Sequence, residues 1–452
     1  MTDTAEVVIV GGGPAGITSA YKLSENGIHT ILLEKDPEIG GLSKTVYHNG
    51  CYIDPGGHRF FTDNQEVKQL WRTLLAADML QVQRNSSIYF KGNFLDYPLN
   101  AYNALASLGT GDILTTITSY FDSRMFPTNP VITFEHHMSN MFGKKLYETF
   151  FKEYTEKVMG LPCSEISADW AIDRIQDFSL GAVLKHASGI KKNNNSKTRT
   201  QVEAFYYPIH GPGTLWAKMA EQIKNRKSHI INTAEVVKIH LDNKGIDFLE
   251  VNIEGKQTEI KGRQLISTMP LRELIMRLQP LPEKEVISAA YNLKYRDFLT
   301  VALIIRKKVV FSQQWIYVNE KAVKVCRIQN YKNWSVAMVD DQDKTCIGME
   351  YFCFKNDVIW SLPDNELIKL AVTEITFLFN INPADIEDST VIRMPNAYPI
   401  YDLKYKDNVV IIMNYLSNLR NLHTIGRNGL HKYVNMDYAM DMALMLCDKI
   451  MK

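Results

Sequence analysis

The order of apolar and polar residues at the start of the chain predicts a strand, a helix and a second strand. Residues 5–10 form a short β-branched run, which is typical of a buried parallel strand. An amphipathic stretch follows over residues 17–26 and ends at Gly27, as a helix that closes on a glycine does. Residues 28–33 form the second apolar run. The whole unit has about the size that a mononucleotide-binding fold requires.

Beyond this unit the pattern becomes helical, then strand-like, then helical again. Apolar residues at three- and four-residue spacing predict a mostly helical region over 99–185, and the polar stretch 188–201 predicts a surface loop. The other expected elements are a helix after Gly213, strands within 236–266 with a turn near 243–245, strands at 295–305, 315–318 and 345–354, and a last helix from about residue 437.

Length and charge narrow the class of protein. The 452 residues are too many for one simple core and indicate two or three domains. A formal net charge of +1 gives no overall field that would attract nucleic acid or an anionic membrane. We expect no secretory signal peptide and no membrane insertion, because the longest apolar stretches, such as 298–305, are far shorter than the ~20 residues that span a bilayer.

The cysteines and histidines predict no metal site. None of the six cysteines forms a CxxC pair, and no histidine cluster has the spacing of metal ligands. We interpret the cysteines as reduced thiols of a cytoplasmic protein.

A glycine cluster follows the first strand and predicts a dinucleotide site. Residues 11–16 read GGGPAG and contain the GxGxxG pattern. Gly11 permits the tight turn, Gly13 lets the backbone approach a pyrophosphate, and Gly16 lets the helix pack closely on the sheet. The N-terminus of the helix would present free N–H groups to the phosphates. Glu34, at the end of the second strand, would accept hydrogen bonds from the ribose hydroxyls.

The next segment indicates FAD rather than NAD. Gly40, Gly41, Leu42 and Ser43 resemble the second glycine pair of a large FAD family that includes amine oxidases, phytoene desaturases, protoporphyrinogen oxidases and UDP-galactopyranose mutases. In that family this loop runs along the cofactor's pyrophosphate. Over the whole chain, the resemblance to this FAD family implies the following FAD-binding residues: Gly11, Gly13, Pro14, Ala15, Gly16, Glu34, Lys35, Gly41, Leu42, Ser43, Gly57, His58, Val237, Gly426, Arg427, Asn435 and Met436.

Residues 54–61, DPGGHRFF, narrow the family further. Two glycines let the backbone lie against a flat ring, and His58 would face the isoalloxazine. The segment resembles the GGH segment of UDP-galactopyranose mutases. The alternative is a structural turn with a packed histidine.

Further segments resemble the same mutases, particularly the eukaryotic type, in the same order along the chain. Tyr97 to Asn100 resemble a segment of the nucleotide-base pocket, and residues 150–160, with Tyr154, an aromatic helix. The resemblance places Arg174 and Arg327 on the substrate diphosphate. The remaining matches are residues 205–216, Trp315 facing the substrate, Tyr398 before Pro399, and the segment 426–429 with Tyr433, Asn435 and Asp437.

The residue types suit a nucleotide-sugar diphosphate. Two arginine forks would neutralise its two charges, and the hydroxyls of Tyr398 and Tyr433 would donate without adding charge. For Arg174 and Arg327 the alternative is a structural ion pair. The sequence departs from the eukaryotic mutases at four positions, so the base and the sugar stay open. These positions are Leu99, Asn100, Met159 and Asn428.

The resemblance therefore implies a flavin-dependent nucleotide-sugar mutase that interconverts pyranose and furanose forms and serves cell-surface polysaccharide biosynthesis. Reduced FAD would act through an N5 adduct of the sugar, with NAD(P)H or a reductase as electron donor. His58, Arg174, Arg327, Tyr398 and Tyr433 would form the catalytic site. The alternative is an FAD oxidoreductase of the protoporphyrinogen oxidase or amine oxidase type, which transfers hydride from substrate to FAD. A flavin-binding protein without catalytic activity is a third possibility.

Pattern and motifs together predict an α/β fold. It would consist of a Rossmann-type FAD-binding domain with an inserted helical segment and an antiparallel-sheet substrate domain. We expect the FAD-binding domain to comprise residues 1–98, 205–280 and 395–452. The helical insertion would cover residues 99–204 and the antiparallel sheet residues 281–394.

Overall fold

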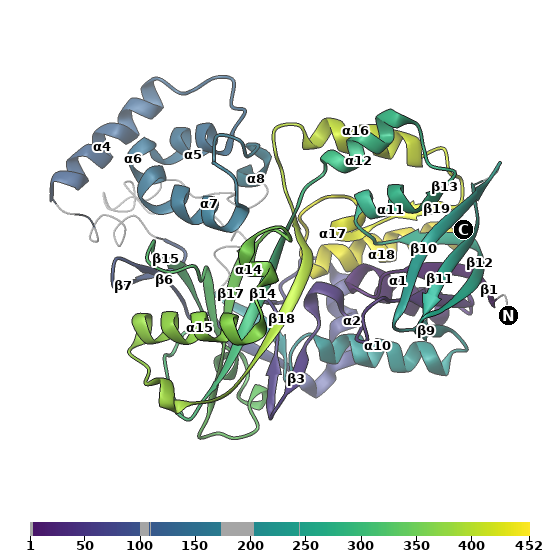
Figure 1. Cartoon of the computed structure of the whole chain (residues 1–452), viewed down its shortest axis with the longest axis horizontal. Helices are drawn as coiled ribbons and strands as arrows, with labels where there is room; N and C mark the ends of the chain where they lie inside the picture. The colour runs from purple at the N-terminus through teal and green to yellow at the C-terminus, as the bar shows by residue number, and fades with distance from the viewer. Residues whose placement is uncertain (1–2, 100–107, 109, 173–202, 244) are drawn as a thin grey trace.

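The computed structural model of the chain describes residues 3–99, 108, 110–172, 203–243 and 245–452. The described part contains two large sheets and a separate group of helices. Figure 1 shows this helical group, α4 to α8 (residues 110–172), at the upper left, above β6 (Ser86–Phe90), β7 (Asn93–Asp96) and β15 (Trp315–Asn319). The fold is mixed α/β, as the sequence predicts.

The first sheet has eight strands and is parallel around its centre. Its strands are β1 (Asp3–Val10), β2 (Thr30–Leu33), β9 (His229–Ile231), β10 (Ala234–Asp242), β11 (Gly245–Ile253), β12 (Lys256–Ser267), β13 (Leu278–Gln279) and β19 (Leu422–Thr424). Strand β1 pairs in parallel with β2 and β12, and β12 also pairs in parallel with β19. Strands β10, β11 and β12 form an antiparallel meander. One sheet thus joins three stretches of chain that are far apart in sequence.

Helices cover both faces of this sheet, because β1 is apolar on both sides. Val7 and Ile9 pack with one helix layer, and Val8 and Val10 pack toward the other. The first layer contains α1 (Pro14–Glu25), α2 (Gln65–Leu75), α10 (Gly213–Asn225) and α18 (Met436–Ile450). The second contains α11 (Leu271–Arg277), α12 (Lys284–Asn292) and α16 (Tyr405–Leu416). Figure 1 shows the two layers on opposite sides of the sheet.

The second sheet has seven strands. In spatial order they are β18 (Ile386–Pro399), β14 (Tyr295–Ile305), β17 (Thr345–Cys353), β16 (Arg327–Asn330), β15 (Trp315–Asn319), β6 (Ser86–Phe90) and β7 (Asn93–Asp96). All pairs are antiparallel except β15 with β6. Leu299, Val301 and Leu303 of β14 pack under α15 (Asp364–Phe379), whereas Phe298 and Ala302 belong to a core on the opposite face.

Smaller elements complete the described chain. The strand pairs are β3 (Val46–His48) with β4 (Cys51–Ile53), and β5 (Met79–Gln83) with β8 (Ala204–Pro208). The helical group contains α4 (Thr110–Met125), α5 (Phe134–Phe142), α6 (Lys144–Leu146), a π-helical turn at Tyr147–Lys152, α7 (Glu153–Met159) and α8 (Asp169–Ile172). Short helices α13 (Tyr331–Trp334), α14 (Val358–Ser361) and α17 (Gly426–Gly429) lie between strands or before α18.

The predicted elements that fall on described residues agree with the observed ones to within a few residues, and the part of the predicted helical region at 173–185 lies outside those residues. The first helix begins earlier than its amphipathic stretch suggests, at Pro14, because Gly13 forms its N-cap. The meander 236–266 and the strands at 295–305, 315–318 and 345–354 are confirmed. The predicted polar loop at 188–201 lies outside the described residues. None of the helices that the structure describes is long and apolar enough to cross a membrane.

Candidate functional site

A cavity of about 1080 Å³ lies at the carboxyl ends of β1 and β2 and extends to the second sheet and the helical group. Val10 and Leu33 mark its first end, and Trp315 and Phe352 its second. Its volume is at the upper limit of ordinary ligand pockets, which hold one drug-sized molecule. The carboxyl edge of a parallel sheet is also where open α/β folds bind ligands.

The glycines of the first motif have two roles: Gly13 leaves space in the cavity, and Gly16 allows close packing of the protein backbone. Gly11 has a φ of +98°, and a Cβ at Gly16 would overlap the carbonyl oxygen of Gly11. A Cβ at Gly13 would meet only Gly41 Cα at 3.9 Å, so this glycine leaves space in the cavity. Gly13 is the N-cap of α1, and no side chain in the described structure caps that helix. The free N–H groups of the first turn suit an anion such as a pyrophosphate.

Glu34, directly after β2, holds the first glycine turn in place through hydrogen bonds to the backbone. Its Oε2 accepts a hydrogen bond from the Gly12 N–H at 2.6 Å, and its Oε1 accepts one from the Asp36 N–H at 2.9 Å. Burial raises the pKa of its carboxyl. Glu34 and Lys35 both line the cavity. The carboxylate is therefore fixed, and each oxygen keeps a lone pair for a ribose hydroxyl.

The second glycine loop lies directly against the first. Gly41 has a φ of +52°, and a Cβ there would lie 3.0 Å from Gly13 Cα. The loop is held from below because Trp216 of α10 donates its Nε1–H to the carbonyl of Ser43 at 3.0 Å. Gly41, Leu42 and Ser43 all line the cavity. The two loops thus form a cradle that a dinucleotide such as FAD fits.

The C-terminal segment closes the same cradle. Gly426 has a φ of +82°, and a Cβ there would lie 3.0 Å from the Cβ of Ala15 in α1. Arg427, Asn435 and Met436 also line the cavity. The expected residue Val237 is not among the cavity residues, and Val236 lines the cavity instead. Neighbouring strand residues point to opposite faces, and β10 has a register shift between Val236 and Lys238 that the sequence does not reveal.

His58 lies in the cavity wall as a neutral imidazole. Its Nδ1 hydrogen-bonds the carbonyl oxygen of Gly56 at 2.9 Å, which assigns the proton to Nδ1 and leaves Nε2 as an acceptor. Burial, reinforced by the nearby charges of Arg427 and Arg327, lowers the pKa of His58 to about 3. A Cβ at Gly56 would lie 3.3 Å from His58 Cε1 and 3.6 Å from Arg327 Nη2, so the glycine permits this close packing.

Arg327 is held by a fully buried carboxylate. Its Nε and Nη2 donate to the two oxygens of Glu350 on the adjacent strand β17. Gln329 donates to the same carboxylate at 2.7 Å. Burial raises the pKa of Glu350, and the arginine beside it opposes that rise. The third nitrogen of Arg327, Nη1, has no acceptor among the described residues, and Arg327 lines the cavity. The ion pair thus orients a guanidinium that can still bind a ligand.

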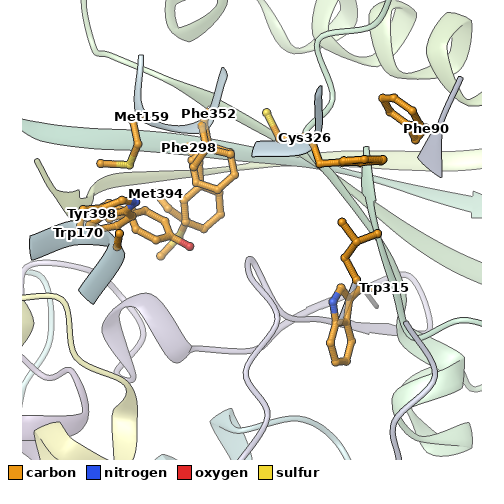
Figure 2. Packing of buried hydrophobic residues seen from close by; sticks show 14 of the residues in the cluster. Phe90, Met159, Trp170, Phe298, Trp315, Cys326, Phe352, Met394 and Tyr398 are labelled. Atoms are coloured by element: carbon orange, nitrogen blue, oxygen red, sulfur yellow. The ribbon is translucent and has the colours of Figure 1, made fainter. Parts of the chain in front are cut away.

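Two tyrosines stack beside a second arginine. The rings of Tyr398 and Tyr433 lie 5.6 Å apart and nearly parallel, and the Arg427 guanidinium lies 4.5 Å from the Tyr433 ring. Arg427 donates to the carbonyls of Ala397 and Val434, which fixes the backbone next to Tyr398 and Tyr433. Figure 2 shows Tyr398 next to Trp170, Phe298 and Phe352, and the ring distances agree.

A further aromatic group lines the cavity along β15. The rings of Tyr97 and Tyr317 lie 4.6 Å apart, and Tyr154 packs edge-on to Tyr317 at 5.7 Å. Tyr317 is directly opposite Arg327 in the pairing of β15 with β16. Trp315 stacks on Trp334, and its buried Nε1 has no acceptor among the described residues. Burial raises the pKa values of Tyr97 and Tyr154, so both hydroxyls stay protonated.

The cavity brings most of the expected residues together, from four distant parts of the chain. The expected substrate residues among them are Tyr97, Tyr154, Trp315, Arg327, Tyr398 and Tyr433. Arg174 and Asn100 lie outside the described residues. Sequence reasoning did not single out Glu350, Tyr317 or Arg59 as site residues. Glu350 did leave a signal, because it is the one charged residue in the apolar run of β17, and such residues are seldom buried unless paired.

Comparison with known proteins places this chain in a family. The family described as flavin containing amine oxidoreductase matches residues 14–395. A probable UDP-galactopyranose mutase of Klebsiella pneumoniae is 28% identical over 170 residues, which are 36% of this chain and 43% of that protein. The dTDP-fucopyranose mutase of Escherichia coli is 27% identical over 184 residues, 36% of this chain and 44% of that protein. The chain thus matches less than half the length of these curated relatives.

Solved structures extend the likeness to the whole fold. The structure of reduced UDP-galactopyranose mutase superposes with a TM-score of 0.84 over 99% of this chain and 95% of that chain, at 20% identity. Putrescine oxidase bound to putrescine superposes with a TM-score of 0.65 over 100% of both chains, at 13% identity. Identities this low establish a shared fold and leave the reaction open.

Proposed function

The chain belongs to the flavin-containing amine oxidoreductase family, which implies FAD, and on this premise we propose that it is a nucleotide-sugar mutase. The proposed reaction interconverts the pyranose and furanose forms of a sugar linked to a nucleoside diphosphate. The names of the two curated relatives support UDP and dTDP as the nucleotides to test first. Bound FAD in its reduced form would supply the nucleophile for the anomeric carbon.

The observation that carries this proposal is the Arg327 guanidinium, which Glu350 fixes in the same cavity as the two glycine loops. Glu350 fixes two of its nitrogens, and Nη1 remains for a phosphate oxygen. Tyr398 and Tyr433 line the same region and can donate hydroxyl hydrogen bonds without further charge. Donors fixed before substrate binds stabilise the negative charge that a departing diphosphate develops. Arg174, outside the described residues, is proposed as a second arginine for this group.

Arginines line the end of the cavity that the substrate would occupy. Charges of both signs line the end near the first sheet, where the proposed ribose and adenine of FAD would lie: Glu34, Lys35, Glu235, Glu273 and Arg277. Arg59 and Arg327 line it near the second sheet, where Arg59 lies 5.9 Å from the Trp315 ring. A cationic amine would meet cations there, so this end of the cavity favours an anionic substrate.

A second candidate function is an FAD oxidoreductase, as in the amine-oxidising members of the family. The aromatic wall of Trp170, Phe298, Phe352 and Tyr398 favours it, because an apolar substrate would be desolvated there. Such an enzyme would take hydride from its substrate and pass electrons to an acceptor.

The test of the proposed function uses the dithionite-reduced holoprotein with UDP- and dTDP-linked hexoses. We expect furanose products from at least one of these sugars, with no net consumption of reductant, and no product from the oxidised protein. Reduction of the bound flavin by amines or porphyrinogens, without any furanose product, would replace the mutase by the oxidoreductase.

His58→Ala is expected to keep FAD bound and to lower turnover by roughly tenfold to a hundredfold, because Nε2 is an acceptor fixed in the cavity wall. The pKa of about 3 means that His58 stays neutral across the working range, so the wild-type pH–rate profile should show no step near pH 6.5. Steady-state rates of wild type and variant from pH 5 to 9 measure the turnover and its pH dependence. A variant that turns over at the wild-type rate would make His58 a packed histidine only.

A further inference from the structure

Asp54 lies behind the cavity wall at the start of the segment that carries His58. It follows β4 directly and is 1% exposed. Gly56, Gly57, His58 and Arg59 line the cavity, whereas Asp54 does not. It therefore touches neither cofactor nor substrate directly, and the proposed chemistry does not use it.

The Asp54 carboxylate joins three segments. Thr45, next to the second glycine loop, donates its hydroxyl to Oδ1 at 2.7 Å. Tyr207 of β8 donates its hydroxyl to Oδ2 at 2.5 Å. Thr45 Oγ1 in turn accepts the Gly213 N–H at 3.0 Å, where α10 begins. One carboxylate thus ties the His58 segment to the cofactor loop and to the helix whose Trp216 supports that loop.

The backbone after Asp54 is fixed by further side chains. Tyr331 donates its hydroxyl to the carbonyl of Asp54 at 2.8 Å, and Thr300 donates to the carbonyl of Pro55. The carbonyl of Gly56 meets His58 Nδ1. The Asp54 side chain therefore adds the link to Thr45 and Tyr207 to a segment whose own backbone is already fixed on its other side.

Asp54 is bound by hydroxyls and not by a cation. The groups that face it are Thr45, Tyr207 and Tyr331, and no lysine, arginine or histidine among the described residues contacts it. Burial raises the pKa of its carboxyl to about 7, against the lowering by Thr45 and Tyr207. A buried carboxyl group without a counter-charge costs stability when it ionises, so an apolar residue would serve the core better.

We propose that Asp54 is a positioning residue that sets the His58 segment against the second glycine loop and so shapes the flavin face of the cavity. Its influence acts through geometry, because the charges that lower the pKa of His58 are those of Arg427 and Arg327. The inference rests on the flavin site and not on the sugar substrate. A protein that binds no nucleoside diphosphate would leave it standing.

The test compares Asp54→Val, which removes both hydrogen bonds, with Asp54→Asn, which keeps the shape. We expect Asp54→Val to weaken FAD binding roughly tenfold or more and to change the visible spectrum of the bound flavin. Asp54→Asn should stay within roughly threefold of wild type, since the Thr45 and Tyr207 hydroxyls can rotate to pair with an amide. Isothermal titration of the apoprotein and spectra of the holoprotein provide the readouts.

Tyr207→Phe and Thr45→Val keep the test decisive if Asp54→Val does not fold, because each removes one donor with almost no change of volume. Both should weaken FAD binding and shift the flavin spectrum in the direction of Asp54→Val. If the variants that fold keep the wild-type FAD affinity and flavin spectrum, Asp54 has only a structural role and the proposal is overturned, even if their melting temperatures are lower.

A pH comparison adds a second readout. The folded protein keeps the Asp54 proton up to about pH 7, whereas the unfolded chain loses it near 3.8. The contribution of this group to stability is complete below pH 3.8 and declines as pH rises through 7. The melting temperature of wild type should therefore fall relative to Asp54→Asn between pH 5 and pH 8. A constant difference would show that Asp54 titrates normally and is not held as described.

Discussion

Gly13→Val is expected to abolish FAD binding and to leave the fold intact. The side of Gly13 that would carry a Cβ meets only Gly41 Cα at 3.9 Å, so the protein has room for a small side chain. That room belongs to the cradle formed by the two glycine loops and the start of α1, and a branched side chain would exclude a pyrophosphate there. Flavin content of the purified variant and FAD titration of its apoprotein measure the loss.

Two other glycines provide the controls. Gly111→Val lies at a helix position with no heavy atom within 4 Å of the added Cβ, and should bind FAD normally. Gly16→Ala should lower the melting temperature although alanine is smaller than valine, because its Cβ would overlap the Gly11 carbonyl. Wild-type FAD affinity in Gly13→Val would show that the cofactor does not use this cradle.

Arg327→Ala is expected to weaken nucleoside diphosphate binding roughly tenfold to a hundredfold, since a charge-assisted hydrogen bond contributes about 1.5–3 kcal/mol. It should also destabilise the protein by about 3–5 kcal/mol, because it leaves Glu350 buried without its partner. Arg327→Lys should preserve much of the stability, because an ammonium can still pair with Glu350, but it should restore binding only in part, because it offers no separate nitrogen fixed toward the phosphate. Titration with UDP and chemical unfolding report the two effects separately.

A double variant separates binding from stability. Arg327→Met with Glu350→Met replaces the pair by apolar side chains of similar size, which often costs little stability. We expect its melting temperature to approach that of wild type while UDP affinity stays low. If UDP affinity returned as well, Arg327 would be a structural ion pair and not a ligand for phosphate.

The glycine loops and central strands could be predicted because their signals are local. Gly11 and Gly13 lie in the turn between β1 and α1, and Gly16 lies in the first turn of α1. The mostly apolar strands β14 and β17 are completely buried. Local spacing determines such elements, so no knowledge of distant contacts is needed.

The polar partners of the site could not be predicted in the same way. Asp54 and Tyr207 are 153 residues apart, and Arg327 and Glu350 are joined only through the pairing of β16 with β17. The sequence suggested that Arg327 either binds the ligand or forms a structural ion pair. The geometry allows both roles, because Nε and Nη2 pair with Glu350 and Nη1 remains for a ligand.

The return of the C-terminus to the first sheet constrains how the chain can fold during synthesis. Strand β19 pairs with β12, α18 packs with α1 in the same core, and Trp71 in α2 donates to the sulfur of Met440 at 3.2 Å. The N-terminal strand and helix leave the ribosome hundreds of residues before these partners. Contacts of such long sequence separation form late and slowly. The nascent N-terminal unit must therefore keep its apolar helix face from aggregating until the last segment arrives, and a chain that stops before β19 would lack one wall of its own cofactor site.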